Sequence, residues 1–174
     1  MSGVSFSYLT NFVAPDPWHS ARLDRVSNLV VIPYISMHGS TEIMVDYLVG
    51  ALAERGVEVH KYNLEVTDIG KLAMSLVDAA TIVIGTPSVH AGAHPNVVYA
   101  AHLANILRPK LKYAAIIGSY GWGTKVVDQI TGLISNLQVE VLGAHLCKGL
   151  PRQEDFAALD SLAEAIKEKH SQLG

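Results

Sequence analysis

The sequence is poor in cysteine, which limits both its covalent and its metal chemistry. Cys147 is the only cysteine among 174 residues. A single thiol forms no internal disulfide, and alone it cannot build a thiolate metal site. We therefore expect a protein of the reducing cytoplasm, in which Cys147 serves as a small apolar side chain.

Long hydrophobic runs are also missing. The longest apolar stretches, such as residues 29–35, fall far short of the roughly 20 residues that a membrane-spanning helix requires. Residues 1–12 lack the basic region and the continuous apolar region of a secretory signal. The sequence therefore predicts neither a membrane partner nor export.

No run of positive charge occurs either. The 13 Lys and Arg residues are opposed by 16 Asp and Glu residues, which gives a formal net charge of -3. Nucleic-acid binding depends on clustered basic side chains that neutralise phosphates, so we expect no nucleic-acid partner. The composition, 49% apolar and 17% charged, is typical of one globular domain.

The pattern of the chain changes after its first 27 residues. Pro15, Pro17 and a polar stretch interrupt any periodicity over residues 1–27, which we interpret as a leader or an interdomain linker. Over residues 28–174, apolar strand-like runs alternate with segments of helical periodicity, which predicts one domain. The expected strands cover 29–35, 57–62, 81–85, 113–118 and 139–142, and a helix follows each of them.

These strands are apolar on both faces, so helices must cover both faces of the sheet. The predicted fold is α/β, with a doubly wound, five-stranded parallel sheet. Ligands bind such sheets beyond the carboxyl ends of the strands, where the winding reverses. The segments after the first, third and fourth strands therefore form the candidate site. Pro33 lies inside the first strand, and its missing N–H predicts a bulge or an unpaired carbonyl there.

The segment after the first strand has the composition of an anion-binding loop. Small hydroxyl residues and a glycine lead into a helix whose first turn offers unpaired N–H groups and the positive end of its dipole. A phosphate monoester fits there, held by neutral dipoles. The alternative is an ordinary turn in which Ser40 or Thr41 caps the helix and nothing is bound. The candidate residues are Ser36, Met37, His38, Gly39, Ser40 and Thr41.

The segments after the third and fourth strands supply candidate contacts for a flat ring. The first of these is long and small-sided, and the peptide of Gly92 can take more than one orientation. The second places two aromatic residues among three glycines, although aromatics of the core at a helix start are the alternative. The candidate residues are Thr86, Pro87, Ser88, Val89, His90, Ala91, Gly92, Ser119, Tyr120, Gly121, Trp122 and Gly123.

Three stretches resemble one known family. Residues 36–42, with Met44, are similar to the phosphate loop and first helix of the flavodoxin-like FMN domain of flavodiiron proteins, also called A-type flavoproteins. Arg108-Pro109-Lys110 followed by residues 118–123 is similar to a second signature of that family, and residues 148–151 also fit. The resemblance covers residues 29–169 and implies a flavodoxin-like sheet with strand order 2-1-3-4-5.

The resemblance implies that FMN is the cofactor, with its phosphate at residues 36–41 and its ring between residues 86–92 and 119–123. It implies an electron-transfer protein that relays electrons to a di-iron oxygen or nitric oxide reductase module, in cis or in trans. The donor would be rubredoxin, a reduced deazaflavin or a nicotinamide system, and a homodimer is compatible with this role. Flavodiiron proteins carry their di-iron site in a separate domain, so we expect no metal site and no catalytic residue here.

One loop departs from the family pattern. Residues 88–91 read Ser-Val-His-Ala, where the family more often has an aromatic followed by asparagines. Two alternative functions stay open, of which the second rests on this loop. One is a standalone NAD(P)H-dependent FMN or quinone reductase of the same fold, and the other is an interaction module that has lost FMN.

Overall fold

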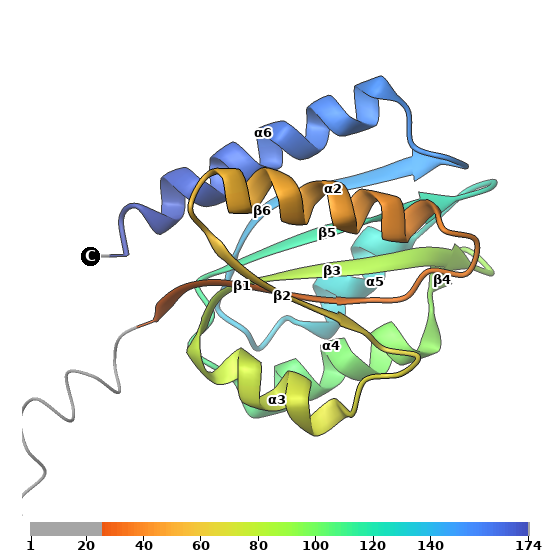
Figure 1. Cartoon of the computed structure of the whole chain (residues 1–174). Coiled ribbons are helices and arrows are strands. Elements are labelled where there is room, and N and C mark those ends of the chain that lie inside the picture. The colour runs from red at the N-terminus through yellow and green to blue at the C-terminus, as the bar shows by residue number, and fades with distance from the viewer. Residues whose placement is uncertain (1–25, 174) are drawn as a thin grey trace, which may run out of the picture.

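The parallel strands of the sheet follow the order β2-β1-β3-β5-β6 in a computed structural model that describes residues 26–173 (Figure 1). The short β4 pairs antiparallel with the end of β3. Counted without β4, this is the order 2-1-3-4-5, so the predicted fold is confirmed. Residues 1–25 of the predicted leader lie outside the described residues. The strands are β1 (Ser27–Tyr34), β2 (Glu58–Asn63), β3 (Ala79–Val89), β4 (Gly92–Ala93), β5 (Tyr113–Tyr120) and β6 (Glu140–Lys148).

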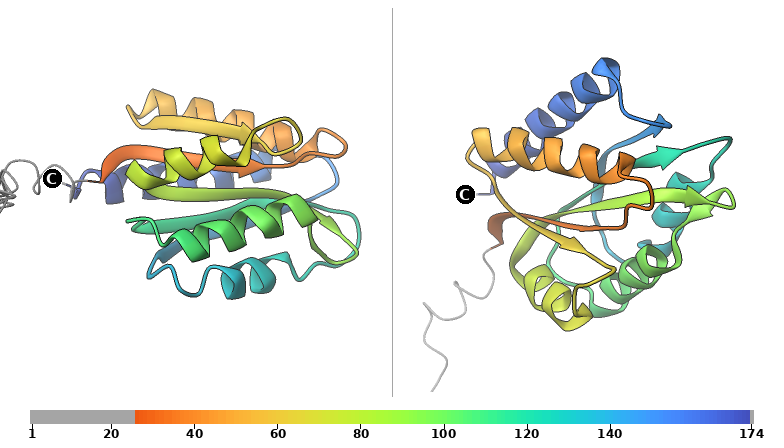
Figure 2. Two further views of the ribbon diagram at one scale, coloured as in Figure 1. Left: turned by 90° about the horizontal axis from the view of Figure 1, so that it is seen from below. Right: turned by 45° about the vertical axis from the view of Figure 1, so that its right-hand side comes forward.

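Helices cover both faces of the sheet, as predicted. One face carries α2 (Ser40–Glu54) and α6 (Gln153–His170), which pack against each other (Figure 1). The opposite face carries α3 (Ile69–Asp78), α4 (Pro95–Leu107) and α5 (Val126–Leu133) (Figure 2). None of the helices within residues 26–173 has the length and apolar character needed to cross a membrane.

The strands contribute alternately to two hydrophobic cores. Val30 and Ile32 of β1 pack toward α2 and α6, whereas Val31 and Ile35 pack toward α3, α4 and α5. All four side chains are fully buried. Burial of one such side chain is worth about 1.5 to 3 kcal/mol, so the two cores fix the strands and thereby the loops at their ends.

Pro33 does not cause the predicted bulge. The register of β1 with β2 runs without interruption through the pair of Pro33 and Tyr62. The register shifts of the sheet lie elsewhere, between Ser27 and Val30 of β1 and in the pairing of β6 with β5. On its other side β1 has no pair with β3 at Ile32 and Pro33, which agrees with the ladder bond that Pro33 cannot donate. Helices bury this central strand on both faces, so packing holds its register where the proline offers no N–H donor.

A buried histidine closes the end of the sheet that lies opposite the predicted site. His170, at the end of α6, places Nε2 2.6 Å from Thr81 Oγ1 and Nδ1 2.8 Å from Asn28 Oδ1. The amide oxygen of Asn28 only accepts, so Nδ1 carries the proton and Nε2 accepts from the Thr81 hydroxyl. Burial lowers the pKa of His170 below its ordinary value, because the charged ring would lose its hydration.

This burial predicts a pH-dependent stability. The unfolded chain takes up a proton on His170 as the pH falls through about 6.5, whereas the folded chain resists protonation until a lower pH. The contribution of His170 to the free energy of unfolding should therefore be complete above about pH 6.5 and should decrease as the pH falls below that value. Urea denaturation at a series of pH values measures the slope. His170→Leu should flatten the dependence of the free energy of unfolding on pH. His102→Gln, at an exposed site of α4, should leave that dependence unchanged. Equal slopes in the wild type and both variants would refute this account.

Candidate functional site

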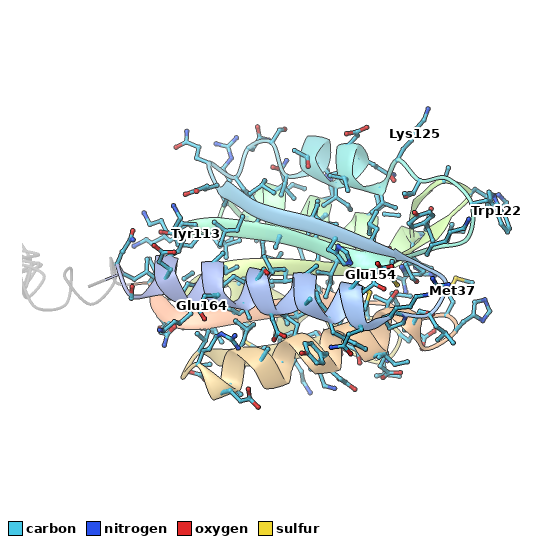
Figure 3. The ribbon with its side chains drawn as sticks, turned by 90° about the horizontal axis from the view of Figure 1, so that it is seen from above. Met37, Tyr113, Trp122, Lys125, Glu154 and Glu164 are labelled. Atoms are coloured by element: carbon cyan, nitrogen blue, oxygen red, sulfur yellow. The ribbon has the colours of Figure 1, made fainter. Side chains whose placement is uncertain are left out.

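Four chain segments meet at the carboxyl edge of the sheet and enclose a cavity of about 530 Å³. They follow β1, β3, β5 and β6, and Figure 3 shows Met37 and Trp122 at the same end of the domain. This volume lies within the range of about 300 to 1,000 Å³ that is usual for small-molecule sites. The lining residues are Met37, His38, Ser40, Pro87, Ser88, Val89, His90, Ser119, Tyr120, Gly121, Trp122, Gly149 and Leu150.

The structure brings most of the predicted residues together at this cavity. Among the predicted residues, those that do not line it are Ser36, Gly39, Thr41, Thr86, Ala91, Gly92 and Gly123. Gly149 and Leu150 line it although the sequence did not mark them as site residues. They follow β6, whose carboxyl end lies at the same edge, so the parallel topology was the signal that could have found them.

The loop after β1 leaves backbone N–H groups without acceptors next to the cavity. Gly39 precedes α2 with φ 84° and has no side chain to cap the helix, while Ser36 Oγ accepts from the N–H of Glu42 in the first turn. Within the described residues, the amides of Gly39, Ser40 and Thr41 have no hydrogen-bond acceptor. The alternative of an ordinary capped turn with Ser40 or Thr41 as the cap is therefore wrong. The first turn of α2 offers uncharged donors and a dipole end to an anion.

Two threonines at this edge have structural partners. The Thr41 hydroxyl lies 3.1 Å from Ser119 Oγ, which ties the β1 loop to the end of β5. The Thr86 hydroxyl donates to the carbonyl of Pro87 and accepts from the N–H of His94. These bonds hold the loops in place, so Thr41 and Thr86 act through neighbouring residues and not through the cavity.

The segment after the third strand is a hairpin and not the open loop that the sequence suggested. β3 continues to Val89, and β4 pairs back through Val89 with Gly92 and through Ser88 with Ala93. The two-residue turn falls on His90 and Ala91, with φ of 48° and 68°. Left-handed backbone is costly for residues other than glycine, so the surroundings must hold this turn.

Hydrogen bonds from the start of α5 hold the hairpin. The N–H of Lys125 donates to the Ala91 carbonyl at 2.6 Å, and the N–H of Ala93 donates to Gln129 Oε1 at 2.7 Å. A Cβ atom at Gly92 would lie 2.8 Å from the same Oε1, so a larger residue there would displace the Gln129 side chain that accepts from Ala93. The hairpin therefore forms a hydrogen-bonded wall of the cavity.

Ser88 carries an unsatisfied hydroxyl on this wall. Its Oγ is buried and has no hydrogen-bond partner, the only such side-chain atom found within residues 26–173. A buried polar atom without a partner costs about 1 to 3 kcal/mol. Ser88 also lines the cavity, so the hydroxyl is placed to bond a polar group of a ligand.

The opposite wall exposes a large aromatic side chain. Trp122 is 87% exposed, so the alternative that the aromatics of this loop belong to the core is wrong for this residue. Met37 and Leu150, at the same mouth, are 52% and 63% exposed. Exposed apolar side chains grouped beside a cavity are typical of a binding surface.

The rim of the cavity carries charges of both signs. A second cavity of about 590 Å³ adjoins the first through Gly121 and Gly149 and is also lined by the cations Lys148 and Arg152 and the carboxylates Glu154 and Asp155. Lys125 starts the helix on the other side. Within the described residues Lys125 and Lys148 form no ion pair, whereas the charge of Arg152 acts on the nearby Asp155 carboxylate.

Two other polar groups near this rim are structural. Burial disfavours the charge of Asp155, but the N–H of Arg152 and the ring of His145, 2.8 Å away, outweigh burial and lower the pKa of the carboxyl group. Burial raises the pKa of Cys147 to about 11, so this thiol is not a nucleophile at neutral pH. No three His, Cys, Asp or Glu residues within the described range are grouped to hold a metal ion.

Comparisons with known proteins place this geometry in a family context. No protein-family model matches the chain. The sequence is 30% identical over 146 residues to an uncharacterised protein of Methanocaldococcus jannaschii, covering 82% of this chain and 37% of that protein. It is 28% identical over 144 residues to the rubredoxin-oxygen oxidoreductase of Megalodesulfovibrio gigas, covering 80% of this chain and 35% of that enzyme.

Solved structures give the same relationship. The rubredoxin oxygen:oxidoreductase of Desulfovibrio gigas matches with a TM-score of 0.83 and 22% identity, over 90% of this chain and 39% of that one. A Megasphaera elsdenii flavodoxin matches with a TM-score of 0.63 and 26% identity, over 80% of this chain and 98% of that one.

The chain is a flavodoxin-like domain whose homologues are flavodiiron proteins and flavodoxins. It spans only 30% to 37% of the length of the first curated relatives. The match to them is therefore a match of the flavodoxin-like domain alone.

Proposed function

We propose that this domain binds FMN and transfers electrons. The phosphate would lie at the loop of residues 36–41, and the ring would lie between residues 86–92 and 119–123. The observation that carries this proposal is the buried, unpartnered hydroxyl of Ser88 on the wall of a cavity at the switch point of the sheet. Flavodoxins and flavodiiron proteins, its homologues, bind FMN at this fold.

The chain supplies binding and orientation, and bound FMN supplies the capacity to carry one or two electrons. The free amides at the start of α2 receive the phosphate through neutral dipoles. The hairpin of β3 and β4 and the loop after β5 form opposite walls for the ring. Trp122 and Met37 at the mouth are placed to contact a docked redox partner.

The partner in this proposal is a di-iron oxygen or nitric oxide reductase module, in cis or in trans. Electrons would reach the domain from rubredoxin, a reduced deazaflavin or a nicotinamide system. Lys125 and Lys148 at the exposed edge of the cavity would favour an acidic surface of the partner, and Glu154 and Asp155, which line the same edge beside Arg152, would limit that preference. Docking of this kind weakens as salt screens the charges.

A second candidate function rests on the adjoining cavity. An NAD(P)H-dependent reductase needs a place for an anionic dinucleotide beside the flavin, and the volume next to Lys148 and Arg152 is about 590 Å³. Rapid mixing of the FMN-loaded chain with NADPH distinguishes the two functions. Direct bleaching of the flavin absorbance by NADPH on the time scale of turnover favours the reductase. The absence of bleaching favours the electron relay to a separate acceptor.

Gly39→Asp tests the phosphate loop. A Cβ atom at Gly39 meets no atom within 4 Å, so the change adds charge without a steric clash, and the backbone strain at φ 84° is shared by the Gly39→Asn control. A carboxylate beside the phosphate repels it, and FMN binding should be lost. Titration of the apoprotein by flavin fluorescence measures the affinity.

Two controls make this result specific to charge in the loop. Gly39→Asn keeps the size and backbone preference without the charge and should retain most of the affinity. Gly50→Asp puts the same charge on α2 at another open glycine and should bind FMN like the wild type. If Gly39→Asp bound FMN with wild-type affinity, the assignment of the phosphate to this loop would be rejected.

Ser88→Ala separates a ligand contact from a structural role. The apoprotein should be as stable as the wild type or more stable, because the substitution removes an unpaired buried oxygen. FMN affinity should fall by about 0.5 to 1.5 kcal/mol, the value of one neutral hydrogen bond. Urea denaturation and fluorescence titration measure the two quantities, with Ser135→Ala at an exposed position as the control. A less stable apoprotein with unchanged FMN affinity would contradict the assignment.

The relay predicts little oxidase turnover by the chain alone. Its reduced flavin should react with oxygen only slowly, because no metal ligand set is present within the described residues. Oxygen uptake driven by an artificial reductant should rise when the di-iron domain of a flavodiiron protein is added. Equal oxygen uptake with and without that domain would contradict the relay and would indicate that the flavin itself reduces oxygen.

A further inference from the structure

A separate cavity of about 550 Å³, the amino-edge cavity, lies where the strands of the sheet begin. Residues 108–112, which connect α4 to β5, and residues 136–138, which connect α5 to β6, line it. Figure 3 shows Tyr113, at the start of β5, at the end of the domain opposite Met37 and Trp122. The cavity is therefore distinct from the candidate FMN site, and its volume is within the range of about 300 to 1,000 Å³ that small-molecule sites have.

Three of the residues that line the amino-edge cavity are cations. Arg108, Lys110 and Lys112 come from one connection, and none of the other described residues that line the cavity is acidic. Arg108 and Lys112 form no ion pair within the described residues. The cavity beside the candidate FMN site differs, because Glu154 and Asp155 line it together with its cations. The amino-edge cavity is therefore the one whose charge has a single sign, and that charge favours an anion.

Negative groups at this edge of the described domain do not cancel the three cations. α4 and α5 end here, and each helix C-terminus carries roughly half of a negative elementary charge. Glu140, at the start of β6, pairs with Lys169 at 2.9 Å. Asp78 ends α3 at the same edge but does not line the cavity. The cavity therefore keeps a positive potential.

Hydrogen bonds hold the two connections in place. The N–H of Lys112 donates to the Ala80 carbonyl at 2.8 Å, and the N–H of Glu140 donates to the Lys112 carbonyl at 2.9 Å. The N–H of Asn136 donates to Asn105 Oδ1 at 2.8 Å. The backbone that carries the cations is thus fixed before a ligand arrives, which lowers the entropy cost of binding.

The same connections also carry neutral donors that are not used within the domain. In the described part of the chain, the backbone N–H groups of Leu111 and Gln138 have no acceptor. The side-chain amides of Asn136 and Gln138 have no partner there either, and both residues line the cavity. Phosphate oxygens accept from neutral amides as well as from cations, so these donors complement the charge.

Arg108 adopts a backbone conformation that is costly for arginine. It ends α4 with φ 46° and ψ 53°, and its N–H donates to the Ala104 carbonyl at 3.0 Å. Glycine is the usual residue at such a helix end, because it has no Cβ atom. Arginine supplies what glycine cannot, namely a planar guanidinium that donates to two phosphate oxygens at once.

We infer that the amino-edge cavity binds a diphosphate group, either inorganic or as part of a nucleotide. Arg108 binds one phosphate through two parallel hydrogen bonds, and Lys110 and Lys112 bind the other as point charges. A ligand here lies at the opposite end of the domain from the candidate FMN site. The cavity is therefore a ligand site and not a second redox site, and the inference does not depend on the proposed function.

Amide NMR titration of the full 174-residue chain with pyrophosphate tests this inference. The signals of Leu111 and Gln138 should shift to saturation at low salt, with a dissociation constant below about 1 mM, and the affinity should fall as salt rises. Adenosine, which has no phosphate, should cause no such shift. ADP identifies the source of the diphosphate, because tighter binding than pyrophosphate indicates a nucleotide and equal binding indicates the inorganic ion.

Removal of one cation should weaken the binding of pyrophosphate. Arg108→Gly suits the left-handed backbone, so the variant should stay folded while its affinity falls about three- to tenfold. Lys112→Gln should have a similar effect. Lys71→Gln, at an exposed lysine in the first turn of α3, is the matched control and should bind pyrophosphate like the wild type. Equal weakening in all three variants would show unspecific attraction to positive charge and would overturn the site.

The location of the shifted signals separates this site from the loop before α2. Gly39→Asp, which places a carboxylate in that loop, should leave the pyrophosphate shifts of residues 108–112 unchanged. Shifts that are confined to residues 36–41 and are lost in Gly39→Asp would overturn the inference and support the phosphate loop instead. Absence of a saturable shift at residues 108–112 and 136–138 up to about 10 mM pyrophosphate would also overturn it, whether or not the chain binds FMN.

Discussion

The close approach of β3 and β5 is the constraint on which the site depends. Gly118 of β5 has no room for a side chain, because a Cβ atom there would collide with the carbonyl of Thr86. The two strands therefore stay paired as far as Pro87 and Ser119, beyond the level at which the sequence placed their ends. The extension carries Ser88 to the cavity and sets the β3–β4 hairpin opposite the loop after β5.

The alternation of apolar strands and amphipathic helices was enough to predict a parallel sheet covered on both faces, whereas the strand order came from the family resemblance. Strands buried on both faces leave little choice besides a parallel sheet, and α6 spans Gln153–His170 as a regular, capped helix. The end of β3 could not be predicted, because Thr86, Pro87 and Ser88 are typical turn residues and only their pairing with β5 and β4 makes them strand. The contribution of Gly149 and Leu150 depends on the position of β6, which is set by tertiary structure.

The two edges of the sheet differ in the features that they contain. At the carboxyl edge the structure keeps costly features, namely a left-handed turn at His90 and Ala91 and an unpaired hydroxyl at Ser88. At the opposite edge His170 is fully bonded and buried. The third left-handed residue other than glycine within the described range, Arg108, ends α4 at the opposite edge, so the buried hydroxyl of Ser88 is the feature that marks the carboxyl edge as a binding site.

Comparison of FMN with riboflavin tests the central claim most directly. The two molecules share the ring and differ in the phosphate, so their binding separates the cavity from the loop before α2. The account predicts that the apoprotein binds FMN with the yellow absorbance of a bound flavin, and binds riboflavin at least about a hundredfold more weakly, a difference near 2.7 kcal/mol. Equal affinity for the two flavins, or no binding of either, would contradict it.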